Sequence, residues 1–284
     1  MILTSIRFLC SRAHLGLFLV LFASSSIYAA DRKAGEVELT DGNIKIMDRG
    51  GHPKEAKLGT IIREGDTIRT GPQGELHMKT ADEGYLALRP NTKVLIEVYR
   101  ANGEQKDRAT IALFRGTLRS ISGWIGKYNA ANYAISTRVA TIGVRGTDHE
   151  PAFIAANVRS GSLVGEAGAY DKVNTGSSFI RNDAGTIFID AGHTGYASFV
   201  TAKLPAVLER MPAFYAPTKN ESRIDQRKDE LSKSLDEAYR SRAAHGGAAS
   251  HQSTSERSDI NRPVQSENAD RPERPDVPDS RRRR

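Results

Sequence analysis

Short stretches in which apolar and polar residues alternate constrain the fold of this chain more than any other feature. The pattern occurs over residues 36–46, 76–80, 94–98, 140–144 and 187–189. Each stretch is bounded by Gly, Asn, Asp or Pro, and no helical period lies between them, so we expect half-buried strands. Many short strands of this kind predict an all-β domain, either a sandwich or a solenoid-like stack.

The N-terminal 30 residues have the order of a secretory signal peptide. Arg7 and Arg12 precede an apolar run at 15–23, and small residues follow up to Ala29 and Ala30. An uncleaved membrane anchor is the alternative, but a spanning helix needs roughly 20 apolar residues and this run is about half that length. We therefore predict cleavage after Ala29 or Ala30, no transmembrane segment afterwards, and a periplasmic or secreted bacterial protein.

Cleavage would change both the cysteine count and the charge of the chain. Cys10 is the one cysteine, so the mature chain would have no disulfide, thiol nucleophile or cysteine metal site. Loss of Arg7 and Arg12 lowers the formal net charge from +7 to about +5. A basic chain often binds nucleic acid, but export argues against that partner. An envelope protein or an anionic envelope polymer is the expected partner instead.

A change in composition near residue 203 divides the mature chain. Before it, glycine and alternating stretches recur, whereas Pro205, Pro212 and Pro217 follow soon after it. The final segment is poor in apolar residues and ends in four arginines, which is typical of disorder. The predicted parts are a β domain at 31–203, a linker at 204–217, a charged helix at 218–243 and a disordered, basic-ended tail at 244–284.

The predicted helix permits two interpretations. Thr218 and Glu221 have the spacing of a capping box, and apolar residues form a narrow stripe along one side. We favour a solvated helix with intrahelical ion pairs such as Asp236 with Arg240, and the alternative is a docking or pairing helix. The stripe consists of Ile224, Leu231, Leu235 and Ala238.

The sequence contains no recognisable catalytic constellation. It has no phosphate-binding loop, dinucleotide-binding glycine pattern, HExxH motif or nucleophile elbow. Asp148, His149 and Glu150 are adjacent, but neighbours on a strand point to opposite faces and cannot easily share one ion. We therefore expect no enzyme activity, no catalytic residues, no metal site and no cofactor.

Three local features stand out from this background. Asp66 follows a glycine and can fix a turn before a strand by accepting a backbone hydrogen bond. Arg145 lies beside Gly146 and Thr147, where its planar guanidinium can clasp neighbouring strands or contact a partner, and we favour the clasp. Trp124 is the single tryptophan, and we favour a core anchor over an exposed partner contact.

These features occur in segments that resemble a FecR domain, read in order. The segments are GDTIRTG at 65–71, ELHMKTADEGYLALRPNTKVLIEVY at 75–99, IALFRGTLR at 111–119 and ISTRVATIGVRGTD at 135–148. The resemblance implies a periplasmic β-rich domain that takes part in binding or signalling across the envelope, without catalytic residues. The residues that match family motif positions are Asp66, Arg69, Thr70, Arg145, Gly146 and Thr147.

Two departures from the family pattern limit what the resemblance implies. Sigma-regulating members carry a cytoplasmic segment and a membrane span before this domain, whereas a signal peptide is expected here. Direct regulation of a sigma factor is therefore not expected. The position after VRGTD, commonly aromatic in the family, is His149 in this sequence.

The sequence thus predicts an exported, non-enzymatic FecR-like module that binds or senses a protein or an envelope polymer. The alternative is a structural scaffold module of an envelope or secretion assembly. A polysaccharide-active enzyme is the least favoured alternative, because a hydrolase needs two carboxylates about 5–10 Å apart and no such pair is marked.

Overall fold

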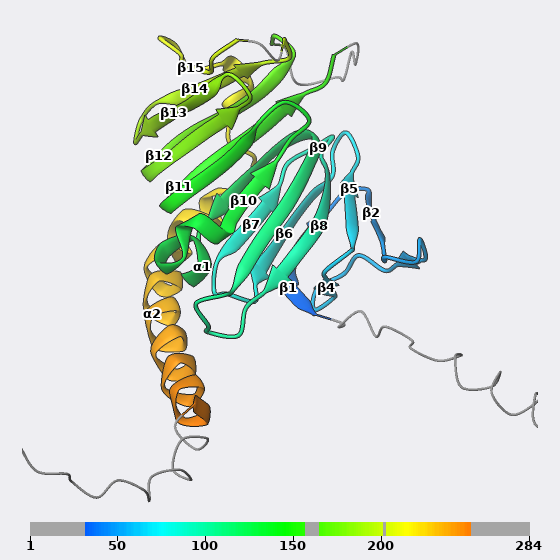
Figure 1. Ribbon diagram of the computed structural model, residues 1–284. Helices are drawn as coiled ribbons and strands as arrows, with labels where there is room; N and C mark the ends of the chain where they lie inside the picture. Colours follow the sequence, from blue (N-terminus) through cyan, green and yellow to red (C-terminus); the bar gives the residue numbers. More distant parts are fainter. Residues whose placement is uncertain (1–31, 157–164, 201–202, 251–284) are drawn as a thin grey trace, which may run out of the picture. The chain divides into compact units, whose positions relative to one another are not determined.

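The computed structural model describes residues 32–156, 165–200 and 203–250, with side chains described up to Ser241 (Figure 1). The strands are β1 (Lys33–Asp41), β2 (Ile44–Met47), β3 (Pro53–Lys54), β4 (Ile61–Arg63), β5 (Thr67–Thr70), β6 (Glu75–Thr80), β7 (Tyr85–Leu88), β8 (Lys93–Arg100), β9 (Arg108–Ile121), β10 (Tyr133–Ser136), β11 (Thr141–Ile154), β12 (Gly168–Asn182), β13 (Gly185–Asp190), β14 (Thr194–Ser198) and β15 (Ala206–Val207). The helical segments are α1 (Trp124–Tyr128), η1 (Ala130–Asn132), η2 (Ala213–Tyr215) and α2 (Ser222–Ser250).

The alternating stretches of the sequence do form strands, as predicted. They overlap β1, β2, β6, β8, β11 and β13. A turn at Asp41-Gly42 joins β1 to β2, and Gly42 has a φ of +68°. A Cβ atom there would lie 2.4 Å from the carbonyl oxygen of Gln73, so this turn requires glycine for both conformation and space.

The strands form one sheet that divides at β9. This long strand pairs with β8 and β10 along its first part and with β7 and β11 along its second part. Gly116, with a φ of +92°, lies where the partner changes, and a Cβ atom there would lie 2.4 Å from Thr92 Oγ1. One branch therefore runs through β7, β6, β1 and β4, and another through β8, β5, β2 and β3.

The buried faces of these two branches share one hydrophobic core. Ile68 and Val94 contribute from the β5–β8 branch, and Met78 and Leu86 contribute from the β6–β7 branch. Full burial of each such side chain contributes about 1.5–3 kcal/mol of transfer free energy. Among the described strands every pairing except β9–β10 is antiparallel. The arrangement is thus a folded, sandwich-like sheet rather than a stack of repeated coils.

The C-terminal helix packs onto the sheet, so the solvated helix that we favoured from the sequence is wrong. Ile224 and Leu231 are buried against Tyr85 and Ala87 of β7, and Leu235 joins the main core. The described residues up to Gly246 accordingly form one compact unit. The narrow apolar stripe is the contact surface of a docked helix.

Polar residues of this region also act differently from the sequence prediction. Thr218 Oγ1 donates to Glu75 of β6, and Glu221 accepts from Arg89, so their side chains bind the β domain instead of forming a capping box. Asp236 accepts hydrogen bonds from Lys127 and Tyr128. These long-range hydrogen bonds form because the helix lies against the β domain, and Asp236 keeps an electrostatic attraction to Arg240 that lowers its pKa further.

The boundaries around the helix also differ from the predicted ones. The segment 204–217, predicted as a linker, contains β15 and η2, and its Tyr215 is buried against Tyr170 and Ile154. The helix runs to Ser250, past the predicted boundary at 243. The predicted signal peptide at 1–30 and residues 251–284 of the predicted tail lie outside the described residues. Within the described ranges, no helix has the length and apolar character needed to cross a membrane.

Candidate functional site

The motif GDTIRTG spans the turn before β5 and the strand itself. Asp66 is buried, and its Oδ2 accepts hydrogen bonds from Lys54 Nζ at 2.6 Å and from the backbone N–H of Arg63 at 2.8 Å. The carboxylate therefore closes the turn, as expected, by accepting a backbone hydrogen bond from a residue three positions before it. In this structure Asp66 fixes the backbone and leaves no oxygen directed at solvent for a partner.

Thr70 and Arg69 lie on opposite faces of β5. Thr70 Oγ1 is buried, donates to the carbonyl oxygen of Arg89 at 2.7 Å and accepts from the backbone N–H of Thr92 at 2.8 Å. It therefore joins β5 to the turn between β7 and β8. Arg69 is exposed, and its guanidinium makes no hydrogen bond or ion pair with the described residues.

The motif Arg145-Gly146-Thr147 forms a bulge in β11. The register with β12 shifts between Arg145 and Asp148, and Gly146 has a φ of +60°. Thr147 is buried, donates to the carbonyl oxygen of Ser177 at 2.6 Å and accepts from the backbone N–H of Arg145 at 3.1 Å. The threonine side chain therefore clasps β11 to β12.

Arg145 does not form the clasp that the sequence predicted. Its side chain is exposed, and its guanidinium makes no hydrogen bond or ion pair with the described residues. The glycine beside it marks a left-handed backbone position rather than a crowded one, since a Cβ atom on Gly146 would meet nothing closer than 3.9 Å. Arg145 is therefore available to a partner, while Thr147 has the structural role.

Trp124 lies in the core and cannot be the partner contact that we considered. It is 0% exposed at the start of α1, and its indole Nε1–H donates to Asp107 Oδ2 at 3.0 Å. Asp107 also accepts from the backbone N–H groups of Asn102 and Gly103, so one carboxylate joins the β8–β9 loop to the indole. The tryptophan thus anchors α1 against the β sheet, the role favoured from the sequence.

The three residues after the bulge separate to the two faces of β11, as strand geometry requires. His149 points into the core, where Nδ1 lies 2.8 Å from Asp171 Oδ1 and the ring meets Tyr133 edge-on. Asp148 and Glu150 point to the opposite face and bind arginines. Within the described part of the chain, no group of three or more His, Cys, Asp and Glu is placed to hold a metal ion.

A buried layer of charge lies between β7, β9 and β11 and the helix α2. Arg89 Nη2 donates to Glu150 Oε2 at 2.6 Å and to Glu221 Oε2 at 2.9 Å, while its Nε donates to Glu221 Oε1 at 2.5 Å. Burial alone would raise the pKa of Glu150, but the charge of Arg89 and a hydrogen bond from Lys172 lower it below its usual value. Arg89 therefore ties the helix to the sheet.

A second ion cluster lies beside it in the same layer. Arg119 donates to both carboxylate oxygens of Asp148, at 2.9 and 2.7 Å, and to Asp225 at 2.7 Å. Lys228 of α2 also contacts Asp148. Burial opposes ionisation of Asp148, but the bonds from Arg119 and Lys228 outweigh it and lower its pKa from 3.8 to about 2. These carboxylates are thus held ionised, as ion-pair partners.

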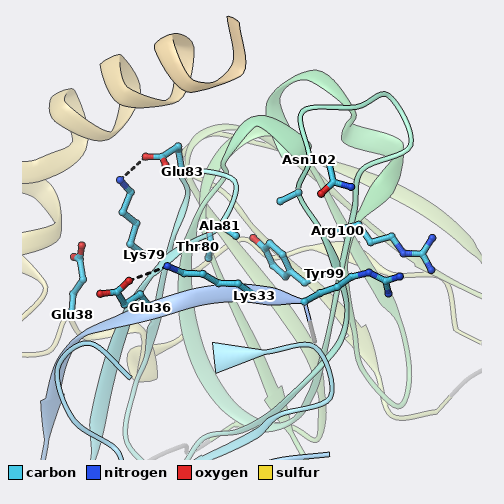
Figure 2. A pocket seen from close by; sticks show the side chains of 12 residues that line it. Lys33, Glu36, Glu38, Lys79, Thr80, Ala81, Glu83, Tyr99, Arg100 and Asn102 are labelled. Atoms are coloured by element: carbon cyan, nitrogen blue, oxygen red, sulfur yellow. Dashed lines mark hydrogen bonds and ion pairs between the residues drawn. The ribbon is translucent and has the colours of Figure 1, made fainter. Parts of the chain in front are cut away.

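A hollow of about 520 Å³ opens beside β1, β6 and the end of β8. Figure 2 shows Glu36 and Glu38 on one side of it and Arg100 and Asn102 on the other. Lys33 Nζ lies 2.9 Å from Glu36 Oε2, so part of the charge is neutralised within the lining. The hollow brings together none of the motif residues.

The structure therefore divides the residues singled out in the sequence. Asp66, Thr70 and Thr147 hold the backbone, and Trp124 fills the core. The two motif arginines, Arg69 and Arg145, are exposed. The sequence analysis missed Arg89 and Arg119, whose partners Glu221, just before α2, and Asp225, on α2, are more than 100 positions away. The one available signal was the period-two placement of Asp148 and Glu150, which indicates that the two carboxylates share one face of the strand.

Comparisons with known proteins agree with the motif assignment. Residues 66–164 match the family described as FecR protein. This range begins at Asp66, includes Arg69 and Thr70, and continues past the bulge at 145–147. Among curated proteins, none matches the sequence.

Solved structures give weaker similarities. A crystal structure of a "putative anti-sigma factor" from Parabacteroides distasonis has 11% identity and a TM-score of 0.37 over 51% of this chain. The matched part is 59% of that protein, and a second crystal structure with the same description gives the same values. A structure described as a cell surface anchoring domain has 22% identity and a TM-score of 0.21, over 22% of this chain and 82% of that one.

Proposed function

Because residues 66–164 match the FecR protein family, we propose that this chain is an exported, non-enzymatic binding module of the bacterial cell envelope. Its partner would be an envelope protein or an anionic envelope polymer. The leader-like pattern of residues 1–30 supports export, and the docked helix makes the module larger than the family match.

The observation that carries the proposal is the difference in burial and side-chain contacts among the motif residues. Asp66, Thr70 and Thr147 are buried, and their side chains are used in internal hydrogen bonds. Arg69 and Arg145 are exposed, with no side-chain partner among the described residues. An arginine has five donors and a fixed positive charge, so an exposed, unpaired one is well suited to bind a carboxylate or phosphate of another molecule.

The state of Asp148 and Glu150 argues against their acting as the carboxylate pair of a hydrolase. Asp148 and Glu150 lie on one face of β11, but each is bound by arginine and lysine. A general acid needs a raised pKa, whereas the pKa of each of these groups is lowered. Their arrangement fits the docking of α2 rather than general acid–base chemistry.

A scaffold role is the second candidate, and one feature favours it. Phe188 is 76% exposed on β13, which pairs with β12 alone among the described strands. An exposed aromatic on an edge strand favours pairing with another chain. Assembly through this edge would give a structural module in which the motif arginines are not needed.

Site-specific photo-crosslinking in the native host tests the proposal. A photoreactive residue would replace Arg69 or Arg145 in the full chain, with Arg223, an exposed arginine on α2, as the control position. We expect a defined adduct in the envelope fraction from position 69 or 145 and none from position 223. A fourth variant carries the photoreactive residue at position 188, and adducts from that position alone would support the scaffold role. Recovery of the protein in the cytoplasm would refute export.

A further inference from the structure

Four cationic residues form a row across four neighbouring strands, β2, β5, β8 and β9. Lys45 is paired with Arg69, Arg69 with Lys93, and Lys93 with Arg115. Residues directly opposite each other on adjacent strands point to the same face of a sheet. The four strands lie side by side in Figure 1, so the row crosses them transversely.

This row lies on the outer face of the sheet. Ile46, Ile68 and Val94, each next in sequence to a member of the row, are buried in the core. Because side chains alternate between faces along a strand, Lys45, Arg69 and Lys93 point outward. A bulge in β9 brings Phe114 and Arg115 together opposite Lys93, and Phe114 is 45% exposed.

The positive charge of the row is not neutralised within the described part of the protein. None of the four residues forms an ion pair there. The neighbouring outward positions are Met47, Thr67, Leu95 and Ala112, none of which is acidic. Some cations elsewhere in the domain do have acidic partners, as Lys54 has Asp66 and Arg49 has Glu64.

Four like charges in register cost stability, because like charges directly opposite repel each other. An anionic ligand laid along the row would remove that repulsion. Adjacent strands lie about 4.8 Å apart, so the row presents a cation at about that interval over roughly 14 Å. This regular spacing matches a linear polymer with repeated negative charges better than one compact anion.

Two further features of the row indicate what kind of polymer would fit. Arginine forks bind carboxylates bidentately, and two of the four residues in the row, Arg69 and Arg115, are arginines. Lys93 Nζ lies over one face of the Phe114 ring, 4.8 Å from its centre, and the ring is still 45% exposed, so an aromatic surface lies directly beside the row. The C–H face of a sugar ring packs on such a surface, whereas a chain of bare phosphates offers nothing to cover it.

We propose that Lys45, Arg69, Lys93 and Arg115 bind an acidic polysaccharide, whose carboxylates lie along the row and one of whose sugars covers Phe114. The inference rests on the proposed function as an envelope binding module, and it names the ligand class and the surface. Arg69 thereby links the family motif to a ligand contact.

Calorimetric titration of the full chain with polygalacturonate tests this surface. Neutral dextran, polyphosphate and a single-stranded oligodeoxynucleotide serve as the other probes. The variant Arg69→Gln/Lys93→Gln is compared with Arg223→Gln/Lys233→Gln, which removes the same charge from exposed positions on α2. Each variant is also melted, and if the first unfolds early, Lys45→Gln/Arg115→Gln replaces it.

We expect polygalacturonate to bind and dextran not to bind. The row variant should bind about tenfold more weakly, equivalent to about 1.4 kcal/mol, and the α2 variant within about twofold of the unchanged chain. Binding should weaken when ionic strength rises from about 0.1 M to about 1 M, because the Debye length falls from about 10 Å to about 3 Å. Phe114→Ala should weaken polygalacturonate binding and leave any polyphosphate binding unchanged.

Three results would overturn the inference: no binding of polygalacturonate, equal loss in both charge variants, or tighter binding of polyphosphate or the oligonucleotide. These results would leave the proposed function standing if position 69 or 145 still crosslinks to an envelope protein. If no such adducts form and polygalacturonate still binds, the partner is an envelope polymer and not an envelope protein.

Discussion

Replacement of Glu221 by alanine perturbs the helix–sheet contact at a buried ion pair. Glu221 is buried at the start of the helical region and binds Arg89 through both carboxylate oxygens, at 2.5 and 2.9 Å. The variant leaves the Arg89 guanidinium buried, with Glu150 as its remaining carboxylate. The substitution therefore tests the ion pair alone, because it leaves the apolar contacts of the helix in place.

The size of the effect follows from burial. Breaking a buried ion pair costs about 3–5 kcal/mol, because the remaining charge stays out of water without its partner. Since Glu150 still binds Arg89, we expect the lower end, about 3 kcal/mol. For a domain of this size, that corresponds to a fall in Tm of roughly 6–12 °C.

Urea unfolding of the full chain measures this free energy, and Glu230→Ala is the matched control. Glu230 lies on the same helix, its side chain is 77% exposed, and its distance to Arg227 is 3.9 Å. The control should change the free energy of unfolding by under about 0.5 kcal/mol. If Glu221→Ala is as mild as the control, the buried pair does not hold α2 to the sheet and the reasoning is refuted.

Three further predictions concern acid stability, the domain boundary and export. Asp148 has a pKa of 3.8 unfolded and about 2 folded, so its contribution of about 2–3 kcal/mol should be lost as pH falls from about 4 to about 2. Urea unfolding across that pH range should show that Asp148→Asn loses less free energy of unfolding than the unchanged chain does. An equal loss in the two proteins would contradict the prediction. A chain ending at Lys203 lacks α2 and should melt early and bind a hydrophobic dye, whereas an unchanged melt would show that the helix adds no stability. N-terminal sequencing of envelope protein should find Ala30 or Asp31 first, and Met1 in an integral membrane fraction would contradict export.

The strands could be predicted from sequence because their signal is local. Val37 and Leu39, like Val94 and Ile96, alternate with polar residues, and period two follows directly from the pleat of a half-buried sheet. The docking of α2 could not be predicted in the same way. Its stripe is narrow, and the charges that hold it, such as Arg89 with Glu221, are 132 positions apart.

The motif residues show a second limit. Sequence could identify Arg145-Gly146-Thr147 as a special position, but not which of its side chains is internal. The bulge at Gly146 redirects the strand, so Thr147 turns inward and Arg145 outward. A register shift of this kind depends on the partner strand, so the three residues of the motif do not by themselves specify it. The row of cations is hidden for the same reason, since its members come together only through pairing of β2, β5, β8 and β9.

The central claim is that this domain binds its partner through the exposed motif arginines while the buried motif residues maintain the fold. Arg145→Ala tests it most directly, by comparing the Tm of the variant with its yield of crosslinked partner from intact cells. We predict a free energy of unfolding within about 0.5 kcal/mol of the unchanged chain and a loss of partner capture. Early melting, or full capture of the partner, would contradict the claim.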